Sequence, residues 1–269
     1  SPRRSEDGGA RAAANRLAWN QVHPIHRETR PYDPAQAFTD PEFLALDDRL
    51  RVLPVRGKKV AQLCCNNGRE LLSLVRLGAT GGAGYDICDE AVQEARELAR
   101  VLACPVGFVR TDILELDPAT QPRHDAVLFT IGALAWIADL ERLFTTARGL
   151  LVPGGSLYIH EQHPVASVFA CLGEPAYDPA NPATPVYSYF RKEQLVSTDG
   201  LDYYGNTAYN ALPDMVLFHT LGEIVTAIAS AGFRILKLEE YPADISNGWP
   251  DLARQGMLPL SWFLEAVSI

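Results

Sequence analysis

The stretch from Lys59 to Asp86 reads KVAQLCCNNGRELLSLVRLGATGGAGYD, and it decides the fold predicted for this chain. Its first part, Val60 to Cys65, is a short apolar run without helical period that ends at a polar turn closed by Gly68. Such a run is typical of a buried parallel strand. A helix follows and stops at Gly78, and a second short apolar segment, Gly82 to Ile87, is the next strand.

Asp86 lies near the end of this second strand, 18 residues after Gly68. A strand, a tight turn, a helix and a strand ending in an acid form a nucleoside-binding half of a doubly wound sheet. An acid at this position can accept hydrogen bonds from the hydroxyls of a ribose. The stretch therefore predicts a ligand that contains a ribose.

The turn indicates which ribose ligand this is. A dinucleotide needs three glycines so that the backbone can approach its pyrophosphate, whereas this turn has only Gly68, with Cys64, Asn66 and Asn67 at the other close positions. NAD and FAD are disfavoured. S-adenosylmethionine has no phosphate, and a few backbone groups and polar side chains at a helix N-terminus can hold its amino-acid end.

The stretch resembles the first motif of the class I S-adenosylmethionine-dependent methyltransferases, an acid-x-G-x-G-x-G run at the end of the first strand. Gln62 stands at the position of the acid, and Cys64 and Asn66 replace two of the glycines. Further along, Asp112 and Ile113 match the acid and apolar residue that the family places at the adenine, although Asp112 also suits a simple helix or turn cap. The cofactor site expected from this resemblance comprises Cys64, Asn66, Asn67, Gly68, Glu70, Asp86, Ile87, Asp112, Ile113 and Thr130.

The whole chain predicts an α/β fold: a Rossmann-like, seven-stranded, mostly parallel sheet with helices on both faces. We expect an N-terminal arm with lid helices (1–55), a cofactor-binding core (56–163), an inserted aromatic-rich cap (164–217) and a closing helix with two strands (218–269). In the arm, one helix is expected from Arg11 to His23, before Pro24, and another from Asp40-Pro41 to Leu53. Trp19 is interpreted either as a lid over the sulfonium or as a residue that pins the arm to the domain.

Composition excludes several classes of function. The chain has 269 residues, 47% of them hydrophobic, and a net charge of −9, which disfavours binding to nucleic acid. The Asp/Asn-Pro-Pro-aromatic motif of methyltransferases that modify nucleic-acid bases is also missing after the fourth predicted strand. Five cysteines without metal-ligand spacing, no apolar run of membrane-spanning length and no signal-peptide pattern predict a soluble cytoplasmic protein without a metal.

The segment 164–217 is rich in proline and tyrosine and has little periodicity. It is predicted to cap a small-molecule substrate, and the alternative is an arm that forms a homodimer. We expect either a monomer or a homodimer. The residues predicted to contact substrate are His23, Tyr32, Tyr189, Tyr203 and Tyr204.

Methyl transfer needs alignment of the nucleophile with the methyl group, exclusion of water and, where the nucleophile carries a proton, a base. His163 is the leading candidate for the base, Glu161 would orient it, and His219 is the second choice. A structural role for His163, beside Pro164, is the alternative. Three functions follow: a small-molecule methyltransferase, a relative that uses S-adenosylmethionine for other chemistry, and a non-catalytic binding protein.

Overall fold

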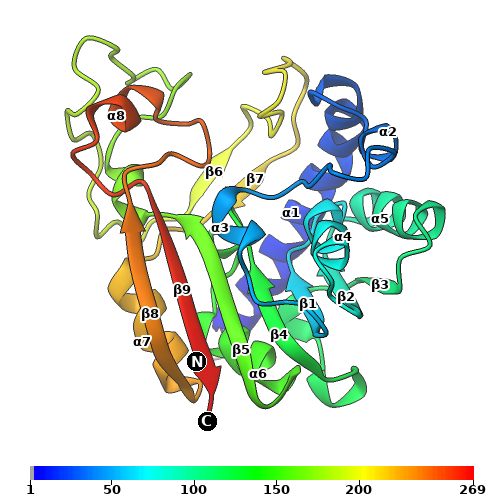
Figure 1. Cartoon of the computed structure of the whole chain (residues 1–269). Helices are drawn as coiled ribbons and strands as arrows, with labels where there is room; N and C mark the ends of the chain where they lie inside the picture. Colours follow the sequence, from blue (N-terminus) through cyan, green and yellow to red (C-terminus); the bar gives the residue numbers. More distant parts are fainter. Residues whose placement is uncertain (1–2) are drawn as a thin grey trace.

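The fold is built on a seven-stranded sheet, seen in a computed structural model that describes residues 3–269, with side chains from Gly8 onward (Figure 1). The strand order is β3-β2-β1-β4-β5-β9-β8. Strand β9 runs antiparallel to β5 and β8 on either side of it, and all other neighbouring strands are parallel. The strands are β1 (Lys59–Leu63), β2 (Gly81–Asp86), β3 (Val106–Arg110), β4 (His124–Phe129), β5 (Leu151–Gln162), β8 (Phe233–Tyr241) and β9 (Ser261–Ser268). The mostly parallel sheet predicted from the sequence is confirmed.

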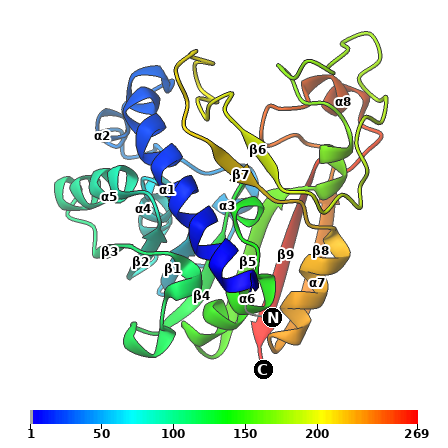
Figure 2. The same ribbon diagram turned by 180° about the vertical axis from the view of Figure 1, so that it is seen from behind.

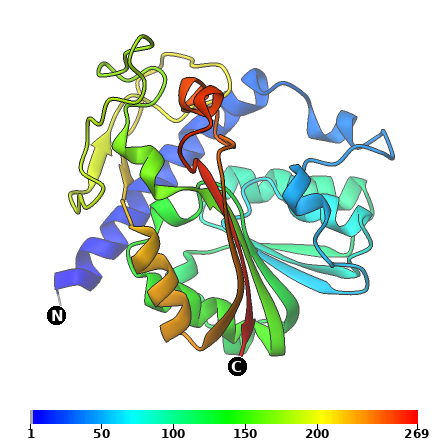
Figure 3. The same ribbon diagram turned by 60° about the vertical axis from the view of Figure 1, so that its left-hand side comes forward.

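Helices cover both faces of the sheet (Figure 3). Side chains alternate along each strand, so that Val60 packs on one face and Ala61 on the other. One face carries α3 (Asp48–Arg51), α4 (Arg69–Arg76) and α5 (Asp89–Val101), and the other carries α6 (Leu140–Gly149) and α7 (Leu221–Ser230). Burial on both faces explains why β1 reads as a continuous apolar run.

The N-terminal helix α1 (Arg3–Thr29) is longer than predicted, because Pro24 lies inside it and does not end it. The part after Pro24 is held by tertiary bonds: His26 Nε2 lies 2.8 Å from the carbonyl of Leu201, and the Thr29 hydroxyl donates to Asp202 over 3.0 Å. These bonds offset the backbone bond that a proline removes. The first two residues of the predicted 1–55 arm lie outside the described residues.

The helix expected from Asp40-Pro41 to Leu53 is wrong. The segment forms the single-turn helix α2 (Pro34–Ala37), an irregular stretch and the short helix α3. Asp40 accepts from the N–H of Glu42 in a turn, and the Arg76 guanidinium binds the carbonyls of Phe38, Asp40 and Phe43. Leu46 and Leu50 of this segment lie in the same buried cluster as Leu71 and Leu74 of α4.

The predicted cap, residues 164–217, contains three short elements. After η4 (Pro164–Val168), strands β6 (Leu195–Ser197) and β7 (Asp214–Val216) form a separate antiparallel pair, which lies beside α1 (Figure 2). Helix α8 (Pro250–Gln255), between β8 and β9, was not predicted, and Leu252 packs there in a small cluster with Phe169. Three 3-10 turns complete the chain: η1 (Ile113–Glu115), η2 (Pro118–Thr120) and η3 (Leu134–Trp136).

Among the described residues, no helix has both the length and the apolar character that a membrane span requires.

Candidate active site

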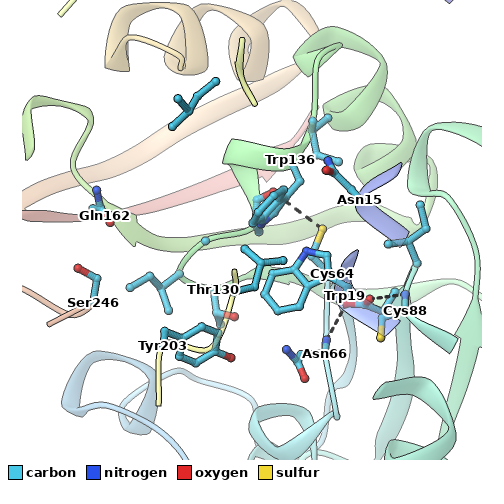
Figure 4. Close-up of a pocket in the computed structure, with 18 of the residues that line it drawn as sticks. Asn15, Trp19, Cys64, Asn66, Cys88, Thr130, Trp136, Gln162, Tyr203 and Ser246 are labelled. Atoms are coloured by element: carbon cyan, nitrogen blue, oxygen red, sulfur yellow. Dashed lines mark hydrogen bonds between the residues drawn. The ribbon is translucent and has the colours of Figure 1, made fainter. Parts of the chain in front are cut away.

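A cavity of about 2500 Å³ opens at the carboxyl ends of β1, β2 and β4, between the sheet, α1 and the segment 195–208 (Figure 4). This edge is where open α/β sheets bind ligands. The connections that follow these strands supply one wall, and Asn15 and Trp19 of α1 belong to the opposite wall. The β6–β7 pair and its connection form a further side.

The turn after β1 has a left-handed backbone at each of the three positions where the resembled motif has glycine. The φ angles are 55° at Cys64, 49° at Asn66 and 72° at Gly68. Such angles are uncommon for residues with a side chain, although asparagine tolerates them better than most. A Cβ at Gly68 would lie 2.4 Å from the Phe108 ring. Packing therefore requires glycine at position 68, in addition to the backbone angle. The turn keeps the conformation of a glycine-rich loop with only one glycine.

Asp86 faces this turn from the end of β2. Its carboxylate accepts from the N–H of Asn66 over 2.7 Å and from the N–H of Cys88 over 2.9 Å. Burial raises the pKa of Asp86, and these backbone bonds oppose the shift. Each carboxylate oxygen accepts one of these bonds and has capacity for another. The aspartate thus lines the cavity and fixes the turn at the same time.

Glu70, in the first turn of α4, supplies a carboxylate beside the position where the resembled motif has an acid. Its Oε2 accepts from Gln62 Nε2 over 2.5 Å and from the Thr130 hydroxyl over 2.8 Å. Gln62 is fully buried, and no described residue donates to its Oε1. Gln62 does not line the cavity, whereas Glu70 does, so the carboxylate of Glu70 can accept from the ammonium of an amino acid. Asn67 also lines the cavity, and its side-chain amide donates to Glu94 over 3.5 Å.

Asp112 and Ile113 line the cavity after β3, and Ile87 lines it after β2. One oxygen of Asp112 accepts from the N–H of Leu114 and caps η1. The capping role considered for Asp112 is therefore present, and it leaves the second carboxylate oxygen free to meet a ligand.

Aromatic rings converge on the cavity from three segments (Figure 4). Trp19 of α1 packs edge to face on Trp136 of η3, with the ring centroids 5.4 Å apart, and its centroid lies 6.4 Å from that of Tyr203. Tyr204 also lines the cavity and bonds Arg69 over 2.7 Å. Trp19 therefore faces the cavity and also packs α1 against η3, while its role as a lid over the sulfonium stays a prediction.

The structure does not bring His163 and Glu161 into the cavity wall. His163 Nε2 lies 2.8 Å from Glu240, and its Nδ1 accepts from the N–H of Val165, so both ring nitrogens are occupied. Glu161 is buried and accepts from the N–H groups of Gly132, Leu134 and Gln162. Alternation along β5 predicted their shared face, but these partners give both residues structural positions.

His219 is the histidine that lines the cavity. Its Nε2 lies 2.8 Å from the carbonyl of Ile137. A carbonyl only accepts, so Nε2 carries the proton and Nδ1 keeps a lone pair in the neutral ring. Burial lowers the pKa of His219 and favours this neutral form.

Three of the residues predicted to contact substrate lie outside the cavity wall: His23, Tyr32 and Tyr189. His23 is buried against Glu94 at 2.9 Å, Tyr32 packs on Phe43, and the Tyr189 hydroxyl accepts from the N–H that begins α7. The other two, Tyr203 and Tyr204, line the cavity.

The sequence between residues 60 and 155 matches a protein family described as a methyltransferase domain. Residues 60–155 of this chain are thus similar to a methyltransferase domain. The match covers the strands and turns that carry Asp86, Asp112 and Thr130.

Solved structures share the fold well beyond the matched methyltransferase domain. An S-adenosylmethionine-dependent methyltransferase from Mesorhizobium loti is 20% identical, with a TM-score of 0.60 over 81% of this chain and 94% of that one. A protein from Listeria monocytogenes described as a putative enzyme of the same kind is 18% identical, with a TM-score of 0.61 over 82% and 96%. The CcbJ methyltransferase from Streptomyces caelestis is 16% identical, with a TM-score of 0.60 over 94% and 98%.

A comparison with curated protein sequences gives no match to this chain.

Several residues of the cavity wall were not predicted from the sequence. Trp136 follows the fourth strand without a motif of its own, and its place opposite Trp19 depends on the path of α1. Asp199 lies in an irregular part of the predicted cap. Ile131 and Gly132 also line the cavity, and the only sign of this in the sequence was the abrupt end of the strand before them.

No group of three or more His, Cys, Asp or Glu that could hold a metal ion occurs within the described part of the chain. The five cysteines are free, and burial raises the pKa of the Cys64 thiol well above its usual value. The Cys64 thiol is thus in its neutral form at physiological pH.

Proposed function

We propose that this chain is an S-adenosylmethionine-dependent methyltransferase that acts on a small molecule, such as a specialised metabolite. The observation that carries the proposal is the left-handed backbone at Cys64, Asn66 and Gly68 with Asp86 bonded to the same turn. This arrangement provides a ribose acceptor and a tight backbone turn at the place where the matched family begins.

The residues of the cavity fit the parts of S-adenosylmethionine. Asp86 would accept from the ribose hydroxyls, and Asp112 with Ile113 would hold the adenine. Glu70, which lines the cavity, would accept from the ammonium of the methionine part. When bound, the cofactor supplies a methyl group that its sulfonium activates.

The chain must then position the substrate, exclude water and remove a proton where the nucleophile carries one. Trp19 and Tyr203 would cover the methyl group and keep water out. We propose His219 as the base in place of His163, because its Nδ1 lone pair is available at a wall of the cavity.

The cofactor is tested by calorimetric titration of the protein with S-adenosylhomocysteine. We expect Asp86→Asn to weaken binding by about 2 kcal/mol, or roughly thirtyfold, because hydrogen bonds to a charged acceptor are lost. Glu97→Gln, on the exposed side of α5, is the control with the same change of charge and should bind as the wild type does. Equal binding by Asp86→Asn and wild type would remove Asp86 from the site.

The reaction is tested by incubating methyl-labelled S-adenosylmethionine with candidate metabolites and following the label. Transfer to a metabolite supports a methyltransferase. Tight cofactor binding with release of a cofactor fragment but no methylated product would instead favour other sulfonium chemistry, and binding without turnover would favour a binding protein. A cytoplasmic location stays a prediction from the unpaired cysteines.

A further inference from the structure

The cavity is larger than one ligand requires. Pockets that hold a single drug-sized ligand have volumes of roughly 300–1,000 Å³. This cavity measures about 2500 Å³, so a large part of it stays open when one such ligand is bound. In Figure 4, Gln162 and Ser246 lie on the opposite side of the cavity from Asn66 of the proposed cofactor site. The side of the cavity at Gln162 is therefore left for the substrate.

Apolar side chains line this cavity and are still largely exposed. Leu172 is 55% exposed, Leu195 is 44% exposed and Tyr203 is 53% exposed, and all three line the cavity. They come from three segments, which are the stretch after η4, strand β6 and the connection between β6 and β7. Exposed apolar side chains that gather in one groove mark a surface that a ligand covers.

The two leucines are held in place by backbone hydrogen bonds. The N–H of Leu172 donates to the carbonyl of Gly248 over 2.8 Å. Leu195 pairs with Val216 in the β6–β7 ladder. Each leucine side chain is thus presented to the cavity by a fixed backbone, and a ligand that covers it removes apolar surface from water.

The side chain of Gln162 offers a polar contact on the same side of the cavity. Gln162 is the last residue of β5 and lines the cavity. Its backbone N–H donates to Glu161 and its carbonyl accepts from the Trp262 indole, but no described residue bonds its carboxamide. A carboxamide both donates and accepts, so it suits a hydroxyl or an amide of a ligand.

We propose that the substrate is an amphiphilic molecule, whose apolar body covers Leu172, Leu195 and Tyr203 and whose hydroxyl or amide group binds the carboxamide of Gln162. This assignment rests on the proposed function, because it places the substrate in the part of the cavity that the cofactor leaves open. The apolar contacts supply affinity, and the carboxamide fixes the orientation of the molecule.

The test compares octyl β-D-glucoside with methyl β-D-glucoside, which share a head with several hydroxyls and differ in the length of the apolar chain. Each is titrated by calorimetry into the full chain saturated with S-adenosylhomocysteine, below the concentration at which the octyl compound forms micelles. We expect the octyl compound to bind at least tenfold more tightly than the methyl compound. This preference should fall below threefold in the double variant Leu172→Ser/Leu195→Ser. Gln162→Ala should weaken binding of the octyl compound at least threefold.

Leu236→Ser is the matched control. Leu236 lies on β8 and is 55% exposed, as Leu172 is, but it does not line the cavity. The variant should therefore keep the preference of the wild type. A preference that falls equally in Leu236→Ser would mean that the octyl chain adheres to any exposed leucine, and it would overturn the proposal. All three leucines are largely exposed, so these variants should fold as the wild type does.

The outcomes separate this inference from the proposed function. If S-adenosylhomocysteine binds and the two glucosides bind equally, or if the double variant keeps the full preference, the apolar site is wrong and the cofactor site stands. Unchanged affinity of Gln162→Ala for the octyl compound would remove Gln162 from the substrate site. If S-adenosylhomocysteine does not bind, the proposed function fails, and the same titrations into the free protein then decide the apolar site alone.

Discussion

The turn after β1 shows that a glycine motif specifies a backbone conformation more than a residue type. Cys64 and Asn66 have side chains and still adopt the left-handed angles that glycine would adopt freely. Each costs roughly 1 kcal/mol, which the surrounding hydrogen bonds must offset. Asn66 limits its own cost, because its side-chain oxygen accepts from the N–H of Asn67.

We expect Asn66→Val to be less stable than Asn66→Gly by about 1–2 kcal/mol, measured by urea unfolding, because a β-branched residue is strained at positive φ. Both variants lose the same side-chain bond, so their difference isolates the backbone. The same two substitutions at Thr80, whose φ is not positive, form the control and should favour valine. Equal stability of the two Asn66 variants would contradict the assigned strain.

His219 and His163 differ in what surrounds the second ring nitrogen, and this difference could not be predicted from sequence. Both lie near the ends of core elements, yet only His219 retains an open Nδ1 at the cavity. The sequence identified both histidines as candidates for the base. Nε2 of each ring has a distant partner, Glu240 for His163 and Ile137 for His219, and the tertiary fold places only His219 in the cavity wall.

We expect His219→Asn to lower turnover about a hundredfold or more, the usual contribution of a general base, with unchanged affinity for S-adenosylhomocysteine. Wild-type activity should be kept at about pH 6.5 and fall only at lower pH, because burial lowers the pKa of His219 below the ordinary histidine value and protonation then removes the Nδ1 lone pair. His163→Asn is the matched control and should affect stability but not turnover. Full activity of His219→Asn with a proton-bearing nucleophile would exclude this base.

At the scale of elements, α1 is attached to the core through a buried ionic cluster on α5. Glu94 lies 2.9 Å from His23 and 2.6 Å from Arg30, and all three side chains are at least nine-tenths buried. Burial acts to raise the pKa of Glu94, but the hydrogen bonds from His23 and Arg30 outweigh it and hold the pKa at about 2. His23, predicted to contact substrate, thus serves to dock the lid helix.

We expect Glu94→Gln to lower the free energy of unfolding by about 3 kcal/mol at pH 7, since a shift from 4.5 to about 2 is worth that much. The folded-state pKa is depressed, so this stability is present above pH 4.5 and is lost as the pH falls toward 2. The gap between wild type and variant should be less than half as large at pH 3. Urea unfolding from pH 3 to 7, with Glu97→Gln as the exposed control, measures it, and a gap independent of pH would contradict the linkage.

A second attachment joins α1 to the cap, where Asn15 and Gln21 each bond two backbone groups of the segment 210–215. The side-chain amides of Asn15 and Gln21 thus bind backbone N–H and C=O groups of this segment, as a neighbouring strand would. We expect Asn15→Leu to speed hydrogen exchange at the amide of Met215 by about tenfold or more, because the buried amide loses its acceptor at a cost of 1–3 kcal/mol. Gln21→Leu, at an exposed site, should have a smaller effect. Unchanged exchange at Met215 would show that α1 is not held there.

At the scale of the whole molecule, sequence alone predicted what depends on local pattern. The parallel strands, helix α4 and the closing helix with its two strands follow from apolar runs and turn residues. The closing helix α7 begins at a capping box between Thr220 and Glu223. The path of α1 beyond Pro24, the irregular backbone around Asp40 and the short β6–β7 pair depend on distant partners such as Asp202 and Arg76. Local helix and strand propensities do not depend on such partners, so they cannot predict these features.

The assembled cavity should also discriminate between ribose ligands. We expect S-adenosylhomocysteine at a hundred times its dissociation constant to raise the midpoint of thermal unfolding by about 5–10 °C, since binding then stabilises the folded chain by about 2.7 kcal/mol. NAD at the same concentration should give no shift, because the side chains of Cys64 and Asn66 stand where a pyrophosphate needs bare backbone. Differential scanning calorimetry measures both. A shift with NAD equal to that with S-adenosylhomocysteine would mean that this turn accepts phosphate after all, and the link between its replaced glycines and a sulfonium ligand would be broken.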